Sequence, residues 1–150
     1  MGPSHLLPVV VGVDGSQHSK RALAWAVDYA QLSGAPLRII CAWEIHGTFG
    51  GEVSFDDVDF QQEAEERLAA VVAELVPNTM ATESRAVEGH PSNLLTQESG
   101  HARLLVLGSR GRGGFANLLL GSITDYCSHH AKCPVVVVRG DNPEPPSAGC

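Results

Sequence analysis

A glycine-rich segment in the C-terminal half of the chain holds residues suited to binding an anion. It contains Gly108, Ser109, Arg110, Gly111 and Arg112, and it directly follows a run of aliphatic residues. Glycines let the backbone approach a ligand closely and adopt positive φ, and amides turned inward in such a loop bind anions. The two arginines add positive charge. The segment therefore predicts a phosphate-binding loop, and a plain surface turn is the alternative that glycine content alone leaves open.

A second group of polar residues follows that loop at the start of an expected helix. Gly121, Ser122, Ile123 and Thr124 stand where the first free N–H groups of this helix occur, and such groups favour phosphate. The hydroxyls of Ser122 and Thr124 add donors. The loop has no Gly-Lys-Ser/Thr sequence and the first strand has no G-x-G-x-x-G sequence, which excludes a Walker A loop and an ordinary dinucleotide fingerprint.

The elements that position these residues alternate between strand and helix. Helical spacing predicts helices over 20–33, 61–76, 91–98 and 122–131, and aliphatic runs predict strands over 6–14, 37–43, 79–87, 104–108 and 134–139. This alternation predicts an α/β domain with a parallel sheet covered by helices on both faces. Ligands of such sheets bind beyond the carboxyl ends of the strands. We therefore expect the segments starting at Asp14, Trp43, Gly89 and Gly108 to lie near one another.

Length and composition narrow the class of protein further. The 150 residues include 43% hydrophobic residues, 10 basic and 17 acidic ones, with a net charge of −7. We expect one folded domain over 1–140 and a disordered tail over 141–150, with no nucleic-acid partner because the chain is acidic. No apolar run approaches the roughly 20 residues of a membrane span. With no signal peptide and with cysteines expected as free thiols, a cytoplasmic location follows.

Three segments together resemble the universal stress protein family, in its ATP-binding branch. Gly108, Gly111, Gly121 and Ser122 fit the family motif G-x2-G-x9-G-[ST]. The opening Val-Gly-Val-Asp-Gly-Ser and the closing Cys-Pro-Val-Val-Val-Val segments also match the family in order. The resemblance covers roughly residues 9–139. It implies a Rossmann-like sheet, related to the adenine nucleotide alpha hydrolases, with strand order 3-2-1-4-5.

The resemblance also implies a nucleotide site that takes ATP with Mg²⁺. Asp14 would bind the ribose, the backbone of Trp43 would meet the adenine edge, and Gly111 with the helix start would hold the phosphates. Positive charge near the phosphates is our own reason for adding the two loop arginines. The expected site comprises Asp14, Gly15, Ser16, Trp43, Gly108, Ser109, Arg110, Gly111, Arg112, Gly121, Ser122, Ile123 and Thr124.

The function implied is a nucleotide-dependent stress-response switch or sensor. No residue is a convincing base for water, so at most slow ATP hydrolysis is expected, and Glu44 is interpreted as a solvated loop charge. Family members commonly dimerise through the last strand, here Val135, Val136, Val137 and Val138. The alternatives are a nucleotide-independent scaffold, a binder of another adenine nucleotide such as cAMP, and an adenylating enzyme, which would need a glycine-rich loop after the first strand.

Other suggestive groups have simpler interpretations. Cys127, His129, His130 and Cys133 resemble a zinc motif, but the helical period turns their side chains in different directions, so one ion would not collect all four. His18 is expected at the surface of a first helical turn. Trp25 and Tyr29, four residues apart, are expected in the core. The acidic segment 52–66 is expected to be a solvated loop and helix start.

Overall fold

Strands and helices alternate along the chain in the computed structural model, which describes residues 6–45, 59–111 and 120–140. The expected tail over 141–150, the segment 46–58 and Arg112 lie outside the described residues. The elements in chain order are β1 (Val9–Gly12), α1 (Gln17–Ser33), β2 (Leu37–Trp43), α2 (Phe60–Leu75), β3 (Thr82–Glu88), α3 (Pro91–Ser99), β4 (Leu104–Gly108), α4 (Ser122–His130) and β5 (Val135–Val138).

The strands form one five-stranded sheet in the order β3-β2-β1-β4-β5. Every pair of neighbouring strands is parallel, as the five apolar runs predicted. The central strands β1 and β4 are buried on both faces, which suits their continuous aliphatic sequences. The polar β3 lies at one edge and β5 at the other. Fold class and strand order are therefore confirmed.

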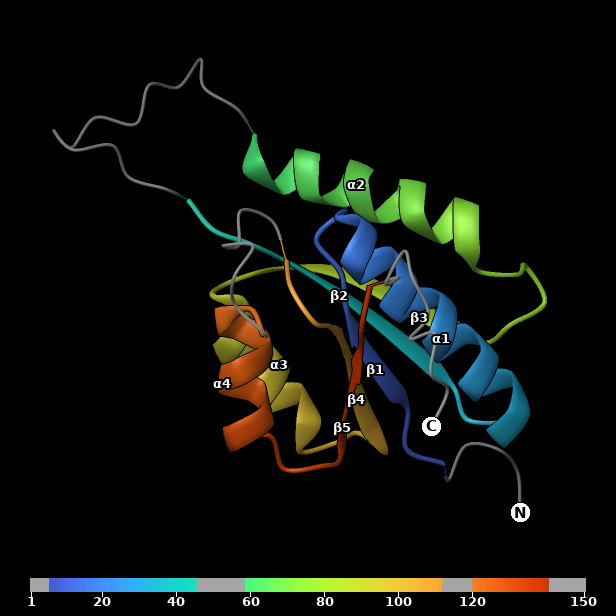
Figure 1. Cartoon of the computed structure of the whole chain (residues 1–150). Coiled ribbons are helices and arrows are strands. Elements are labelled where there is room, and N and C mark those ends of the chain that lie inside the picture. The colour runs from blue at the N-terminus through green and yellow to red at the C-terminus, as the bar shows by residue number, and fades with distance from the viewer. Residues whose placement is uncertain (1–5, 46–58, 112–119, 141–150) are drawn as a thin grey trace, which may run out of the picture.

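Helices cover both faces of the sheet (Figure 1), and the buried side chains divide into two layers, one on each face. Val9 and Val11 of β1 pack in the layer under α1 and α2. Val10 packs in the opposite layer, with Leu95 of α3 and Cys127 of α4. This period of two residues divides each strand between two apolar cores, so the sheet is held from both sides and its carboxyl ends form a fixed edge.

Local capping decides where the first helix begins and ends. We expected it to start at residue 20, but it starts at Gln17. The Oγ of Ser16 accepts a hydrogen bond from the backbone N–H of Ser19 at 3.2 Å, which caps the helix three residues earlier. Gly34, at φ 73°, then closes the helix in the left-handed region. Because α1 starts at Gln17, only a short turn separates its first residues from the end of β1.

The remaining boundary differences are short. The first strand covers Val9–Gly12 rather than 6–14, because the chain turns away at Asp14 after the N–H of Val13 donates to the carbonyl of Ile40. The third strand begins at Thr82 rather than at residue 79. A turn precedes it, in which the N–H of Met80 donates to the carbonyl of Pro77 at 3.1 Å.

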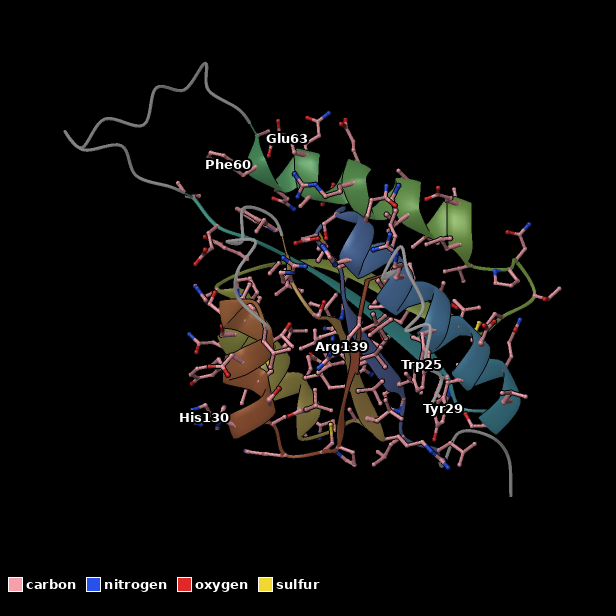
Figure 2. The ribbon with its side chains drawn as sticks, viewed as in Figure 1. Trp25, Tyr29, Phe60, Glu63, His130 and Arg139 are labelled. Carbon is pink, nitrogen blue, oxygen red and sulfur yellow. The ribbon has the colours of Figure 1, made fainter. Side chains whose placement is uncertain are left out.

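The prediction that Trp25 lies in the core is wrong. Trp25 and Tyr29 stack with ring centroids 5.3 Å apart, and Trp25 keeps 36% of its surface exposed. Figure 2 labels both rings on the same side of α1. Tyr29 packs partly against the core, so the pair covers its rim. Among the described residues, no helix is both long and apolar enough to cross a membrane.

Candidate functional site

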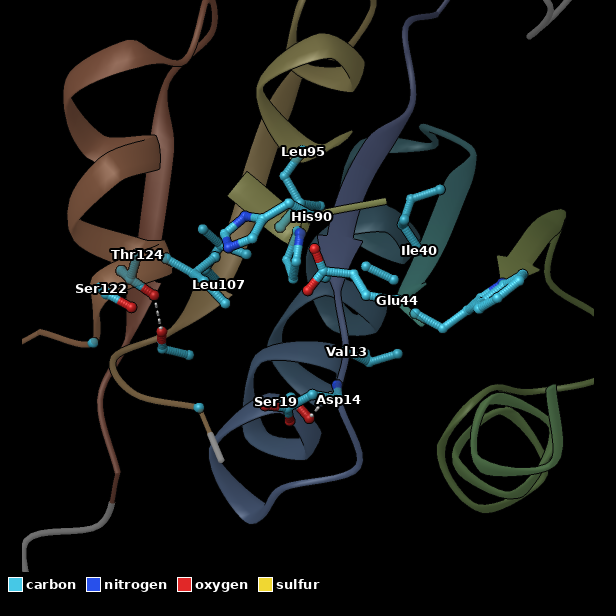
Figure 3. A pocket seen from close by; sticks show the side chains of 18 of the residues that line it. Val13, Asp14, Ser19, Ile40, Glu44, His90, Leu95, Leu107, Ser122 and Thr124 are labelled. Carbon is cyan, nitrogen blue, oxygen red and sulfur yellow. Dashed lines mark hydrogen bonds between the residues drawn. The ribbon is translucent and has the colours of Figure 1, made fainter. Parts of the chain in front are cut away.

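A cleft of about 710 Å³ opens at the carboxyl ends of β1, β2 and β4, where parallel α/β sheets bind ligands. Figure 3 shows side chains from several separate elements facing this space. Most residues of the expected site line it. They are Asp14, Trp43, Gly108, Arg110, Gly111, Gly121, Ser122, Ile123 and Thr124.

Asp14 is held at the mouth of β1 by its own turn. Its Oδ1 accepts a hydrogen bond from the N–H of Ser16 at 2.9 Å. Its backbone N–H donates to the Oγ of Ser19 at 3.2 Å. Gly15 between them has φ +85°, which an L side chain rarely adopts. Gly15 and Ser16 do not line the cleft themselves, so they serve by fixing the carboxylate that does.

Gly111 brings the glycine-rich loop against that carboxylate. A Cβ on Gly111 would lie 2.8 Å from the Oδ2 of Asp14. A Cβ on Gly108 would lie 2.7 Å from the carbonyl oxygen of His18. Both positions are therefore crowded by neighbouring atoms, and glycine is the residue that fits. The glycine-rich loop and the turn after β1 therefore contact each other at the carboxyl ends of the strands.

The start of α4 is anchored to β4 and leaves backbone donors for a ligand. The N–H of Gly121 donates to the carbonyl of Ser109 at 2.7 Å. The buried hydroxyl of Thr124 donates to the carbonyl of Gly108 at 2.7 Å. No side chain caps this helix, so the N–H groups of its first turn have no intrahelical partner. Such a helix start attracts anions.

The β2 wall presents a residue that the sequence reasoning missed. The carbonyl of Trp43 accepts a hydrogen bond from the N–H of Gly89 at 2.8 Å, so its backbone faces β3. Peptide groups alternate along a strand, and that of Ala42 therefore faces the β1 side. Ala42 lines the cleft. The peptide groups of Ala42 and Trp43 therefore face opposite sides of β2. The residue types within β2 do not show which of the two faces β1.

The inner wall of the cleft is apolar and one histidine stands at its rim. Ile40, Leu95 and Leu107 line it, and each keeps less than 5% of its surface exposed. The Nδ1 of His90 accepts a hydrogen bond from the N–H of Ser92 at 3.2 Å and caps α3. The neutral ring therefore carries its proton on Nε2. An apolar inner wall with polar groups around it suits a flat base.

Charges of both signs surround this apolar wall. The lining acids are Asp14, Glu44 and Glu63, and the lining arginines are Arg67 and Arg110. Glu44, interpreted from the sequence as a solvated loop charge, is half-buried and faces the cleft (Figure 3). Sequence reasoning also missed Glu63 and Arg67, because their helix enters the site only through the packing of α2 beside α1.

The expectation for His18 changes with the structure, and the expected core cysteine beside solvated histidines is confirmed. His18 is half-buried rather than exposed, and its Nδ1 is buried without a hydrogen-bond partner in the described residues. Burial raises the pKa of the Cys127 thiol, and burial also raises that of Cys133. Cys127 is buried while His129 and His130 are exposed, so these side chains do not converge. The described residues contain no cluster of three metal-ligating side chains.

Comparison with known sequences identifies relatives of the whole domain. A family model described as the universal stress protein family matches residues 6–139. Universal stress protein Rv2005c of Mycobacterium tuberculosis is 40% identical over 144 residues, which cover 91% of this chain and 46% of the relative. The chain therefore spans about half the length of this relative.

Comparison with solved structures agrees with the fold. A universal stress protein in complex with cAMP is 28% identical, with TM-score 0.58, covering 88% of this chain and 96% of the other. The universal stress protein of Archaeoglobus fulgidus in complex with dAMP is 23% identical, with TM-score 0.62, covering 87% and 96%. The latter likeness concerns the fold alone.

Proposed function

The chain belongs to the universal stress protein family, and from this premise we propose that its cleft binds an adenine nucleotide, with ATP and Mg²⁺ as the resident ligand. One observation carries the proposal. The Gly111 loop lies so close to Asp14 that a Cβ at position 111 would stand 2.8 Å from its carboxylate, beside a helix start that has no side-chain cap. A carboxylate for hydroxyl groups and backbone donors for phosphate stand side by side there, as a nucleotide requires.

The base, the ribose and the phosphates of a nucleotide each face a different group of residues in the cleft. The base lies on Ile40, Leu95 and Leu107, with its edge toward the backbone of Ala42 in place of the expected Trp43. Asp14 accepts hydrogen bonds from the ribose. The phosphates lie between Gly111 and the first turn of α4. A Mg²⁺ ion bound there keeps mainly phosphate and water ligands, with Asp14 or Glu44 as the nearby carboxylate, and it neutralises phosphate charge.

The site is suited to binding more than to catalysis. Phosphoryl transfer requires a positioned nucleophile and charge stabilisation. Of the described acids and imidazoles that line the cleft, Asp14 is assigned to the ribose and the Nδ1 of His90 is engaged in a capping bond, so we assign no base for water. We therefore propose a nucleotide-dependent switch or sensor in which the bound nucleotide is the signal and hydrolysis is slow.

cAMP is the second candidate ligand, and the charge of the cleft favours it. Three acids and two arginines line the described cleft. A nucleotide with one negative charge is repelled less there than ATP without a metal ion. The similar structure in complex with cAMP points the same way. Ligand choice then depends on whether Mg²⁺ accompanies the nucleotide.

We also propose that two copies pair through β5, in the cytoplasm. Within the described residues, strand β5 pairs with β4 alone, so its outer N–H and C=O groups lie on an edge that no described strand covers. Its four valines are half-buried within one chain, and an apolar open edge promotes pairing. Val137→Lys should convert a dimer to a monomer in light scattering, whereas Ala70→Lys, at an exposed position of α2, should not. A wild-type monomer would overturn this pairing.

Thermal unfolding with a nucleotide panel tests the proposed ligand. A micromolar site at a thousandfold excess of ligand adds about 4 kcal/mol, which raises Tm by roughly ten degrees in a domain of this size. ATP–Mg²⁺, AMP, cAMP and GTP are compared, with Asp14→Ala as the site variant and Asp28→Ala, on the exposed face of α1, as the control. No shift with any nucleotide would favour the scaffold alternative.

A further inference from the structure

Arg67 is a cation of the cleft that no carboxylate neutralises in the described part of the chain. Its side chain is half-buried and lines the cleft from α2. Glu63 stands four residues earlier, at the spacing that forms ion pairs on helices, yet no ion pair or hydrogen bond joins Arg67 to any described residue. Arg38, by contrast, pairs with Glu98 at 2.9 Å.

The position of Arg67 is fixed by a glycine in the β1–α1 turn. A Cβ on Gly15 would lie 2.6 Å from the Cδ of Arg67 and 3.4 Å from its Nε. The stem of Arg67 therefore lies against Gly15, the residue that follows Asp14. Any side chain at position 15 would push it away. The absence of a side chain at Gly15 gives Arg67 its route to the edge of the sheet where the ligand lies.

The chemistry of this cation suits a phosphate. A half-buried charge without a partner has lost part of its hydration and gains from any anion that enters. The guanidinium donates two parallel hydrogen bonds to phosphate oxygens, which an ammonium does not. Arg110 reaches the same cleft from the loop after β4. The two arginines thus stand on walls contributed by different elements.

We propose that Arg67 is a specificity-determining residue of this site, which binds the phosphate oxygens of the nucleotide from the α2 wall. The inference rests on the proposed function and adds a contact to it. Arg67 then makes the site select nucleotides over nucleosides. Stacking of the guanidinium on the adenine ring is the competing arrangement, and it would strengthen adenosine binding equally.

Calorimetric titration of adenosine, AMP and ATP–Mg²⁺ separates these arrangements. Arg67→Gln should weaken AMP and ATP binding roughly 10- to 150-fold, the value of one charge-assisted contact. Adenosine binding should not change. Arg67→Lys keeps the positive charge but lacks the two parallel N–H donors of the guanidinium, so it should recover part of the lost affinity. Arg103→Gln is the matched control, because Arg103 is exposed and its backbone bonds to Pro8 at the opposite end of the sheet.

The outcomes are distinct. Arg67→Gln that binds AMP as tightly as the wild type overturns the inference and leaves the proposed function intact. Equal losses for adenosine and AMP, in a variant with the wild-type Tm, overturn it in favour of stacking. If Arg67→Gln has a lowered Tm, the comparison of adenosine with AMP is made in Arg67→Lys. A wild type that binds neither AMP nor ATP overturns the proposed function itself.

Discussion

Replacing Gly111 with alanine probes the contact between the glycine-rich loop and Asp14. The new Cβ would lie 2.8 Å from the Oδ2 of Asp14, and ordinary contact begins at 3.4 Å, so the carboxylate must retreat by 3.4 − 2.8 = 0.6 Å. Among the described glycines, those with positive φ are Gly15, Gly34 and Gly89. Gly111 is not among them, so alanine adopts its backbone conformation without strain.

Gly111→Ala should weaken ligand binding more than it lowers the free energy of unfolding. Moving Asp14 also disturbs its hydrogen bond with the N–H of Ser16 and shifts the oxygen offered to the ribose. Loss of one hydrogen bond to a charged group costs about 1.5–3 kcal/mol, or roughly 10- to 150-fold in Kd. The free energy of unfolding should change by less than about 1 kcal/mol, as is typical of an unstrained Gly→Ala change.

Titration calorimetry with AMP and chemical unfolding measure the two effects separately. Gly100→Ala is the matched control, because a Cβ there meets its nearest atom, the carbonyl oxygen of Gln97, at 3.4 Å and lies outside the cleft. It should bind AMP as the wild type does. Wild-type affinity in Gly111→Ala would refute the reasoning that this contact builds the site, and so would a loss of several kcal/mol in stability without a change in affinity.

Three further predictions concern the scaffold of the site. Thr124→Val leaves the carbonyl of Gly108 without its 2.7 Å donor and should lower the free energy of unfolding by about 1–3 kcal/mol; an unchanged urea midpoint would contradict this. Gly15→Ala forces a side chain into φ +85° against Arg67 and should cost at least about 1–2 kcal/mol, whereas a wild-type Tm would show that the turn relaxes freely. Burial raises the pKa of Cys127 above its ordinary 9.0. Its contribution to stability is therefore complete below pH 9 and is lost as the pH rises further; a loss equally steep in Cys127→Ser would exclude this thiol as the cause.

The parts of the fold set by local sequence could be predicted. Aliphatic runs between turns specify parallel buried strands, and the polar character of 82–88 marks an edge. Asp14 and Gly111 were found because both directly follow strands, and strand ends meet at one edge of a parallel sheet. The family motif then orders the strands, because it ties the glycine-rich loop to a known topology.

The parts set by packing between distant elements could not be predicted. Arg67 reaches the cleft only because α2 lies beside α1, and nothing in its own segment records that neighbour. Ala42 and Trp43 differ in which strand their peptide groups face, which is a matter of register. Trp25 stands at a helical spacing typical of core residues. The buried positions of α1 nevertheless cover a narrower face than its apolar residues do, and Trp25 lies outside that face.

A crystal structure of the protein grown with saturating ATP and Mg²⁺ tests the central claim most directly. The account predicts a nucleotide in the cleft at the carboxyl ends of β1, β2 and β4, with its ribose at Asp14 and its phosphates between Gly111 and the start of α4. Arg67 should contact the phosphates. A nucleotide bound elsewhere, or an empty cleft in crystals that contain saturating ligand, would contradict it.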